Sequence, residues 1–347
     1  MIRLVPPKAQ TRSPEAAILT QKPQHGVAAP WVYNSAVPHE RPTQRPGRGE
    51  SREVAELKRV REEHPEIASA IDMQIALIDL QRRVRARVPM PWIEVDREWL
   101  KRQHELGRPL LRFKDIPLDW TDVRLMFRQT ADILRRFDTI EAADHASIQT
   151  ISRSGNALDP LVITWYEGAA QRGMPDPAGK ADGQAAAPEL PATPGLPATD
   201  EAPPIDADTL DQVLLLTMKP FLERCAEVVQ QRTDFSTWTQ SYCPLCGGDP
   251  EFSVITPAAD RLLICSRCAG RWRFHPLACP FCGNADRAQI TSFASRDGRY
   301  RIYACDVCLR YLKAYDGRNA PRPVMVAVDT VATLPLDAAA MQRGYRG

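Results

Sequence analysis

The chain has 347 residues, a formal charge of +2 and 31 prolines. Its near-neutral charge gives no whole-chain argument for nucleic-acid binding, and so many prolines predict stretches that do not pack. No run reaches the roughly 20 apolar residues of a membrane helix, and the N-terminus has no apolar core of signal-peptide length. We therefore expect a cytoplasmic protein with no membrane partner, in which the thiols stay reduced.

The composition of the N-terminal part of the chain predicts a proline-rich tail followed by a helical domain. Residues 1–50 carry eight prolines and are expected to form a disordered tail. Apolar residues at helical spacing predict a helical domain over 51–170, with helices starting near Ser51, at Asp96, and at Asp119 or Thr121. Further helices are expected over 140–151 and 158–166.

A segment poor in core-forming residues follows the helical domain. Within 171–206, the stretch 175–204 holds eight prolines and eight alanines, which is typical of a linker or surface insertion. Residues 207–240 are expected to hold a long helix, ending near Gln231 and kinked by Pro220. After the cysteine-rich region, residues 321–347 are expected to form a strand over Val324–Val328 and a closing helix over Thr330–Tyr345.

Eight of the nine cysteines lie within 66 residues and repeat one spacing, Cys-x-x-Cys. Two such pairs can supply four thiolates in a tetrahedron around a zinc ion or a rubredoxin-type iron. A disulfide framework suits small secreted domains instead, and a thioredoxin-like site needs only one pair. The spacing therefore predicts two metal sites, holding two ions of iron or zinc per chain, with these ligands: Cys243, Cys246, Cys265, Cys268, Cys279, Cys282, Cys305 and Cys308.

The order of the pairs indicates which of them share a metal. Two pairs read Cys-Pro-x-Cys-Gly, at Cys243 and Cys279, and each is followed by a plain pair after a β-rich segment. Asp297-Gly298 is typical of a hairpin turn between the last two strands. We expect each ribbon to close on itself, first pair with second and third with fourth; a crossed arrangement is the alternative.

The residues favour a role other than catalysis. A four-thiolate site is closed, whereas catalytic zinc keeps an open position. His275 is expected to be a structural or surface histidine, and Cys225 a small buried apolar residue. Eleven Arg and Lys between Cys243 and Arg318 face seven Asp and Glu, but thiolate charge offsets this excess. The interpretations left are a binding or assembly role, a zinc-ribbon nucleic-acid binder, and a rubredoxin-like electron carrier.

The cysteine pairs and their flanks resemble the formate dehydrogenase accessory protein FdhE family. The resemblance depends on an ordered set of motifs: Lys219-Pro220-Phe221-Leu222, the four cysteine pairs, Pro250, Trp272, Tyr311-Leu312-Lys313, Asp329, Ala332-Thr333-Leu334, Leu336-Asp337 and Gly344-Tyr345-Arg346. It implies an α+β fold: a helical N-terminal domain, then two tandem rubredoxin-like or zinc-ribbon modules over 241–320, and a C-terminal helix.

The resemblance also implies a function. Members of this family are cytoplasmic, non-catalytic maturation factors that contact the catalytic subunit of formate dehydrogenase before its export, and iron is reported for their rubredoxin-like sites. The sequence departs from the family at Pro276, where an arginine is usual, and in its longer insertion over 175–204. The helical half matches only in outline, through His64-Pro65 and Gly107-Arg108-Pro109.

Overall fold

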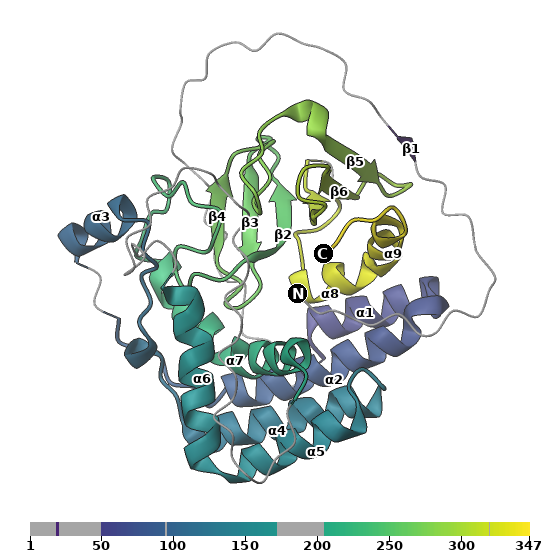
Figure 1. The fold of residues 1–347 in the computed structure, drawn as a ribbon. Coiled ribbons are helices and arrows are strands. Elements are labelled where there is room, and N and C mark those ends of the chain that lie inside the picture. The colour runs from purple at the N-terminus through teal and green to yellow at the C-terminus, as the bar shows by residue number, and fades with distance from the viewer. Residues whose placement is uncertain (1–18, 21–49, 94–95, 172–204, 319) are drawn as a thin grey trace.

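A computed structural model describes residues 19–20, 50–93, 96–171, 205–318 and 320–347 (Figure 1). Of the expected tail over 1–50, only β1 (Leu19–Thr20) and Glu50 are described, and most of the expected insertion over 171–206 lies outside the described residues. The α+β order is confirmed: helices come first, a mixed sheet follows, and helices close the chain.

The N-terminal helices begin where polar side chains cap them. Ser51, Asp96, Asp119 and Asp206 each accept a hydrogen bond from a backbone N–H of the first turn, as favoured N-cap residues do. The helical starts expected at Ser51, Asp96 and Asp119 are thereby confirmed. The helical segments are α1 (Arg52–Glu63), η1 (Pro65–Ile67), α2 (Ala68–Arg85), α3 (Arg97–Glu105), η2 (Phe113–Asp115), α4 (Trp120–Arg136), α5 (Ala142–Arg153), α6 (Gly155–Ala170) and α7 (Ala207–Gln230).

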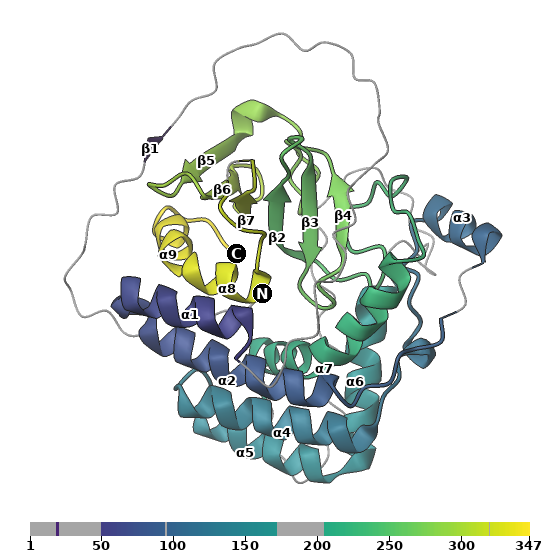
Figure 2. The same cartoon turned by 180° about the vertical axis from the view of Figure 1, so that it is seen from behind.

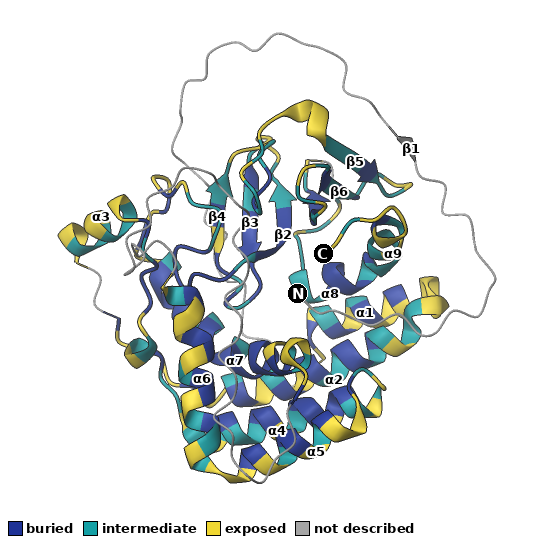
Figure 3. Cartoon of the chain, in the orientation of Figure 1, coloured by how far each residue is buried: buried dark blue, intermediate teal, exposed yellow. Residues whose placement is uncertain are grey.

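Helix α7 runs through the centre of the molecule. It is buried over most of its length between the other helices and the sheet, whereas the protruding α3 is largely exposed (Figure 3). Pro220 lies inside this helix and is itself buried. None of the described helices is both long enough and apolar enough to cross a membrane.

The two cysteine-rich ribbons merge into one sheet with the strand order β1-β5-β6-β7-β2-β3-β4. All neighbours are antiparallel except β2 and β7, whose parallel pairing from Phe252–Lys313 to Ile255–Asp316 joins the ribbons. The hairpin turn at Asp297-Gly298 is confirmed, with Gly298 at φ +70°. The strands are β2 (Pro250–Ile255), β3 (Arg261–Cys265), β4 (Arg271–Phe274), β5 (Ile290–Ala294), β6 (Tyr300–Cys305) and β7 (Tyr311–Asp316), with η3 (Arg287–Gln289) before β5.

The C-terminal segment differs from the expectation. The strand expected over Val324–Val328 is wrong: helix α8 (Val326–Ala332) occupies this place, and the closing helix is α9 (Leu334–Gln342). The β-branched residues indicated a strand, but the Asp329 carboxylate accepts the Met325 N–H at 2.7 Å and so favours a helical turn. Val328 and Val331, three residues apart, then face the apolar side of α1. The view from behind shows α8 and α9 between the sheet and α1 (Figure 2).

Candidate metal centres

The structure gathers the eight predicted cysteines into two groups. The first quartet is Cys243, Cys246, Cys265 and Cys268, and the second quartet is Cys279, Cys282, Cys305 and Cys308. Within each quartet all four sulfur atoms lie within 4.8 Å of one another. Neighbouring Sγ atoms within a quartet lie as close as 3.4–3.7 Å, near the edge of about 3.8 Å expected for a tetrahedron with metal–sulfur bonds of about 2.3 Å. The expected pairing, first with second and third with fourth, is therefore confirmed.

All four Cys-x-x-Cys turns, called knuckles one to four in chain order, share one backbone pattern. The first cysteine donates its N–H to the carbonyl five residues on, and its own carbonyl accepts the N–H four residues on. That fourth residue has a positive φ in every knuckle, from +54° to +75°. Glycine adopts it at lowest cost, and two knuckles use other residues. The four are Gly247, Ala269, Gly283 and Leu309.

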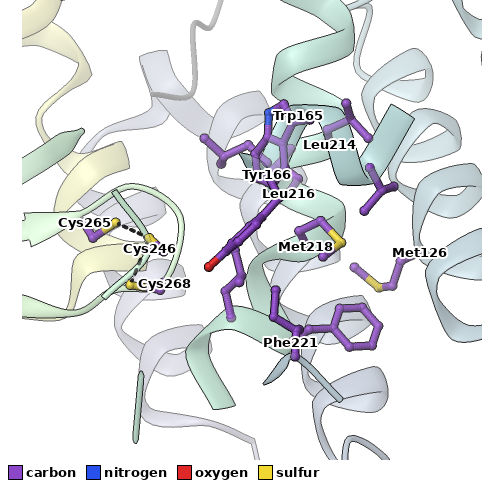
Figure 4. Packing of buried hydrophobic residues seen from close by; sticks show 14 of the residues in the cluster. Met126, Trp165, Tyr166, Leu214, Leu216, Met218, Phe221, Cys246, Cys265 and Cys268 are labelled. Carbon is purple, nitrogen blue, oxygen red and sulfur yellow. Dashed lines mark hydrogen bonds between the residues drawn. The ribbon is translucent and has the colours of Figure 1, made fainter. Parts of the chain in front are cut away.

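The first quartet is sealed into the main core of the molecule. Its sulfurs pack beside Tyr166 of α6, and Met218 and Phe221 of α7 belong to the same core (Figure 4). Knuckle one also pairs by backbone with a distant segment: Leu110 donates to Pro244 O at 2.9 Å and Leu111 to Leu245 O at 2.8 Å. The helical half thus forms part of the wall of this site.

An arginine closes the first quartet from the side of α6. The Arg267 guanidinium lies 3.8 Å from the centroid of the Trp165 ring and donates to the Trp165 carbonyl oxygen. Trp165 is held in turn by a 2.7 Å hydrogen bond from its Nε1 to Asp211 of α7. This stack covers knuckle two with a desolvated cation–π contact.

The charges of the first quartet suit a dication. Hydrogen bonds from the Cys243, Cys265 and Cys268 thiols lower the pKa of Cys246 well below its usual value, and the Arg267 charge acts in the same direction. Burial raises the pKa of Cys243. Four buried thiolates repel one another, so full deprotonation needs a metal ion to compensate the charge.

The second quartet lies closer to solvent. Cys282 and Cys308 are partly exposed, although Cys279 and Cys305 are buried. Burial raises the pKa of Cys308 to about 11; the Cys282 thiol acts in the same direction, and the Arg310 N–H and the Cys279 thiol act against it. Burial also tends to raise the pKa of Cys305, but hydrogen bonds from the N–H groups of Cys308 and Val307 and contacts with the Cys282 and Cys308 thiols together leave this pKa lowered. The Arg310 guanidinium lies 3.7 Å from the Phe281 ring centroid, across knuckles four and three.

The C-terminal motif residues hold knuckle four and its strand. Tyr345 donates to Asp306 at 2.6 Å, and Arg346 exchanges backbone hydrogen bonds with Leu309 and Tyr311. Asp337 accepts from Lys313 at 2.6 Å and from Tyr311 at 2.8 Å. Asp329 is fully buried and accepts from Tyr300 and Arg322. These residues act on the shape of the sheet, not as ligands.

The remaining singled-out residues lie outside both quartets. Cys225 is buried in α7, and burial raises its pKa to about 12, as suits a small apolar residue. His275 is exposed, and its Nδ1 accepts the Leu277 N–H at 3.3 Å. Pro276 is also exposed, and its carbonyl oxygen accepts from buried Arg261.

Reasoning from the sequence missed the residues that the helical half contributes to the first quartet. Trp165, Tyr166, Leu110 and Leu111 lie far from the cysteines in sequence and have no spacing in common with them. The nearest signal was Gly107-Arg108-Pro109, which directly precedes the segment that pairs with knuckle one.

Comparisons with known proteins give a consistent set of relatives. Protein FdhE homolog of Shewanella baltica (strain OS185) is 37% identical over 109 residues, covering 30% of this chain and 36% of the relative. Protein FdhE homolog of Aquifex aeolicus (strain VF5) is 31% identical over 146 residues, covering 41% and 50%. Protein FdhE of Escherichia coli O1:K1 / APEC is 31% identical over 109 residues, covering 30% and 35%. The matched region thus spans between about a third and a half of these relatives.

A solved structure extends the likeness over most of the fold. The crystal structure of the FdhE protein from Pseudomonas aeruginosa superposes with a TM-score of 0.52, covering 85% of this chain and 91% of that one. The two sequences are 19% identical, so this likeness concerns the fold. No family model matches the chain.

Proposed function

We propose that this chain, which belongs to the FdhE family, is an accessory protein for the assembly of active formate dehydrogenase. The observation that carries the proposal is its likeness to three proteins named FdhE at 31–37% identity. The names of these relatives point to an accessory protein, and we propose that the chain acts in the cytoplasm by binding the catalytic subunit, without catalysing a reaction itself.

The two quartets support a metal-bearing platform. Each would hold one ion of iron or zinc through its four sulfurs: Cys243, Cys246, Cys265 and Cys268 in one site, and Cys279, Cys282, Cys305 and Cys308 in the other. A metal bound in this way supplies cross-links between knuckles and, if it is iron, a one-electron centre. The protein itself supplies rigid knuckles, and a sheet that binds the two sites together.

The arginines of the metal region give little support to the nucleic-acid alternative. Several of them pair with carboxylates of the same region and therefore have less charge to offer to phosphates. These pairs are Arg273–Asp260, Arg299–Asp297, Arg301–Asp316 and Arg318–Asp316.

Deleting the gene tests the proposal in its natural host. We expect formate dehydrogenase activity to disappear while the catalytic polypeptide is still made, and a plasmid copy of the gene to restore it. The tagged protein should co-purify with the catalytic subunit from cells blocked in assembly. Normal activity in the deletion strain would refute the accessory role, and a salt-dependent shift of labelled RNA by the purified protein would favour the nucleic-acid alternative.

A further inference from the structure

The two quartets differ in how far their cysteine residues are exposed to water. In the first, Cys243, Cys246 and Cys265 are fully buried and Cys268 is 1% exposed. In the second, Cys282 and Cys308 are both partly exposed. The two sites use the same knuckle geometry, so the difference arises from what surrounds them.

Contacts with the helical half close the first quartet on several sides. Gly247 of knuckle one lies so near the C-terminal end of α6 that an added Cβ would overlap the Ala169 carbonyl oxygen. Gly270, which follows knuckle two, lies near α7: an added Cβ would be 3.4 Å from Gln230 Nε2 and 2.9 Å from the Leu245 side chain of knuckle one. A chelator can reach these sulfurs only if the main core opens, and such openings cost a large part of the stability of the molecule.

Among the residues that the structure describes, none covers the second quartet in a comparable way. At Gly283, which corresponds to Gly247, an added Cβ would meet no described atom within 4 Å. In knuckle four, Val307 is 59% exposed and Leu309 is 47% exposed. The two partly exposed cysteines, Cys282 and Cys308, come from both knuckles of the quartet, so solvent meets ligands on each of them.

We propose that the second quartet is the exchangeable metal centre of this protein and that the first quartet is a permanent structural one. The proposal rests on metal binding as proposed above, but not on any role in formate dehydrogenase assembly. A ligand that attacks the second ion can displace Cys282 and Cys308 one at a time while the sheet stays folded. At the first ion, the same attack has to wait for the core to open.

Zinc is the probe for the test. The full-length protein, reconstituted with zinc under anaerobic conditions, is mixed with a chromogenic chelator in excess. We expect two ions per chain, released in two phases of one ion each, with the fast phase at least about tenfold quicker because a closed shell limits access. The circular dichroism spectrum should persist through the fast phase.

Two matched variants assign the phases. Cys308→Ser and Cys268→Ser each remove the last cysteine of a quartet. Cys308→Ser should abolish the fast phase and keep the slow one. Loss of the slow phase in Cys308→Ser would overturn the assignment, and so would two ions leaving the wild type at one rate. Wild-type protein that binds no zinc would instead refute metal binding itself, and one ion per chain would refute a second centre.

Alkylation of the wild-type protein gives an independent measurement if Cys268→Ser fails to fold. Iodoacetamide is added to the zinc-loaded protein, and modified peptides are followed by mass spectrometry. Cys282 and Cys308 should react before any cysteine of the first quartet, since these two residues are partly exposed. Earlier modification of Cys243, Cys246, Cys265 or Cys268 would contradict the proposal.

Discussion

At the level of single residues, Gly247 and Gly283 occupy equivalent positions in knuckles one and three but differ in surroundings. Their φ angles are +73° and +75°, so alanine at either position carries a similar backbone cost of roughly 1–2 kcal/mol. Of these two positions, only at Gly247 would the new Cβ also overlap a described atom, the Ala169 carbonyl oxygen, and lie tightly against Pro109.

Gly247→Ala should therefore lower the free energy of unfolding by about 2 kcal/mol more than Gly283→Ala, because overpacking adds to the backbone cost. Urea denaturation of both metal-loaded variants measures the difference. Equal losses would mean that α6 yields at Ala169 without cost, and that the close approach of knuckle one to this helix does not matter.

A second residue-scale prediction concerns Lys313, which is 3% exposed and donates to Asp337 and to the Thr330 carbonyl oxygen. Lys313→Met leaves the partly buried Asp337 carboxylate without its cation. We therefore expect the free energy of unfolding to fall by roughly 3–5 kcal/mol. Lys101→Met is the matched control, because Lys101 is 80% exposed and its pair with Glu105 spans 3.8 Å. The control should change stability by no more than about 0.5 kcal/mol. Thermal melts of the two variants at one pH provide the comparison, and similar melting temperatures would refute the prediction.

At the level of elements, local signals were sufficient for caps and knuckles but not for long-range pairing. The start of α3 at Asp96 and each Cys-x-x-Cys knuckle follow from residues a few positions apart, and the grouping of the cysteines follows from the order of the pairs within each ribbon. Two pairings join segments that are far apart in sequence: β2 with β7, and Leu110 with Pro244. No spacing of residues in the sequence indicates either of them. At α8 the β-branched residues were a misleading signal, because Asp329 accepts the Met325 N–H in a helical turn and is itself held by buried contacts with Tyr300 and Arg322.

The C-terminal residues form an element of their own that braces knuckle four. A chain ending at Gly344 loses the hydrogen bond from Tyr345 to Asp306 and the backbone bonds of Arg346 to Leu309 and Tyr311. We expect it to release the second zinc ion several-fold faster than the wild type, and the first ion at an unchanged rate. Chelator kinetics on the zinc-loaded proteins measure both rates. Unchanged release of the second ion would mean that knuckle four holds its shape without the brace.

At the level of the whole molecule, the first quartet belongs to the same core as the helical layer. Buried residues of α2, α4, α6 and α7 form one continuous cluster with Cys243, Cys246, Cys265 and Cys268. The second quartet adjoins smaller clusters, which the C-terminal helix α9 covers. Loss of the first ion should therefore affect a larger part of the structure than loss of the second ion.

Cys243→Ala should disrupt the helical half as well as its own ribbon. A structural zinc site contributes on the order of 10 kcal/mol, as much as the whole stability of a typical domain. Cys308→Ala should loosen knuckles three and four only, because α8 and α9 still cover the strands around them. Far-UV circular dichroism measures helical content in both variants: we expect a large loss for Cys243→Ala and a near-native spectrum for Cys308→Ala. If Cys243→Ala retained its helicity, the helical layer would fold without the first metal centre. The prediction that the shared core couples the two would then be wrong.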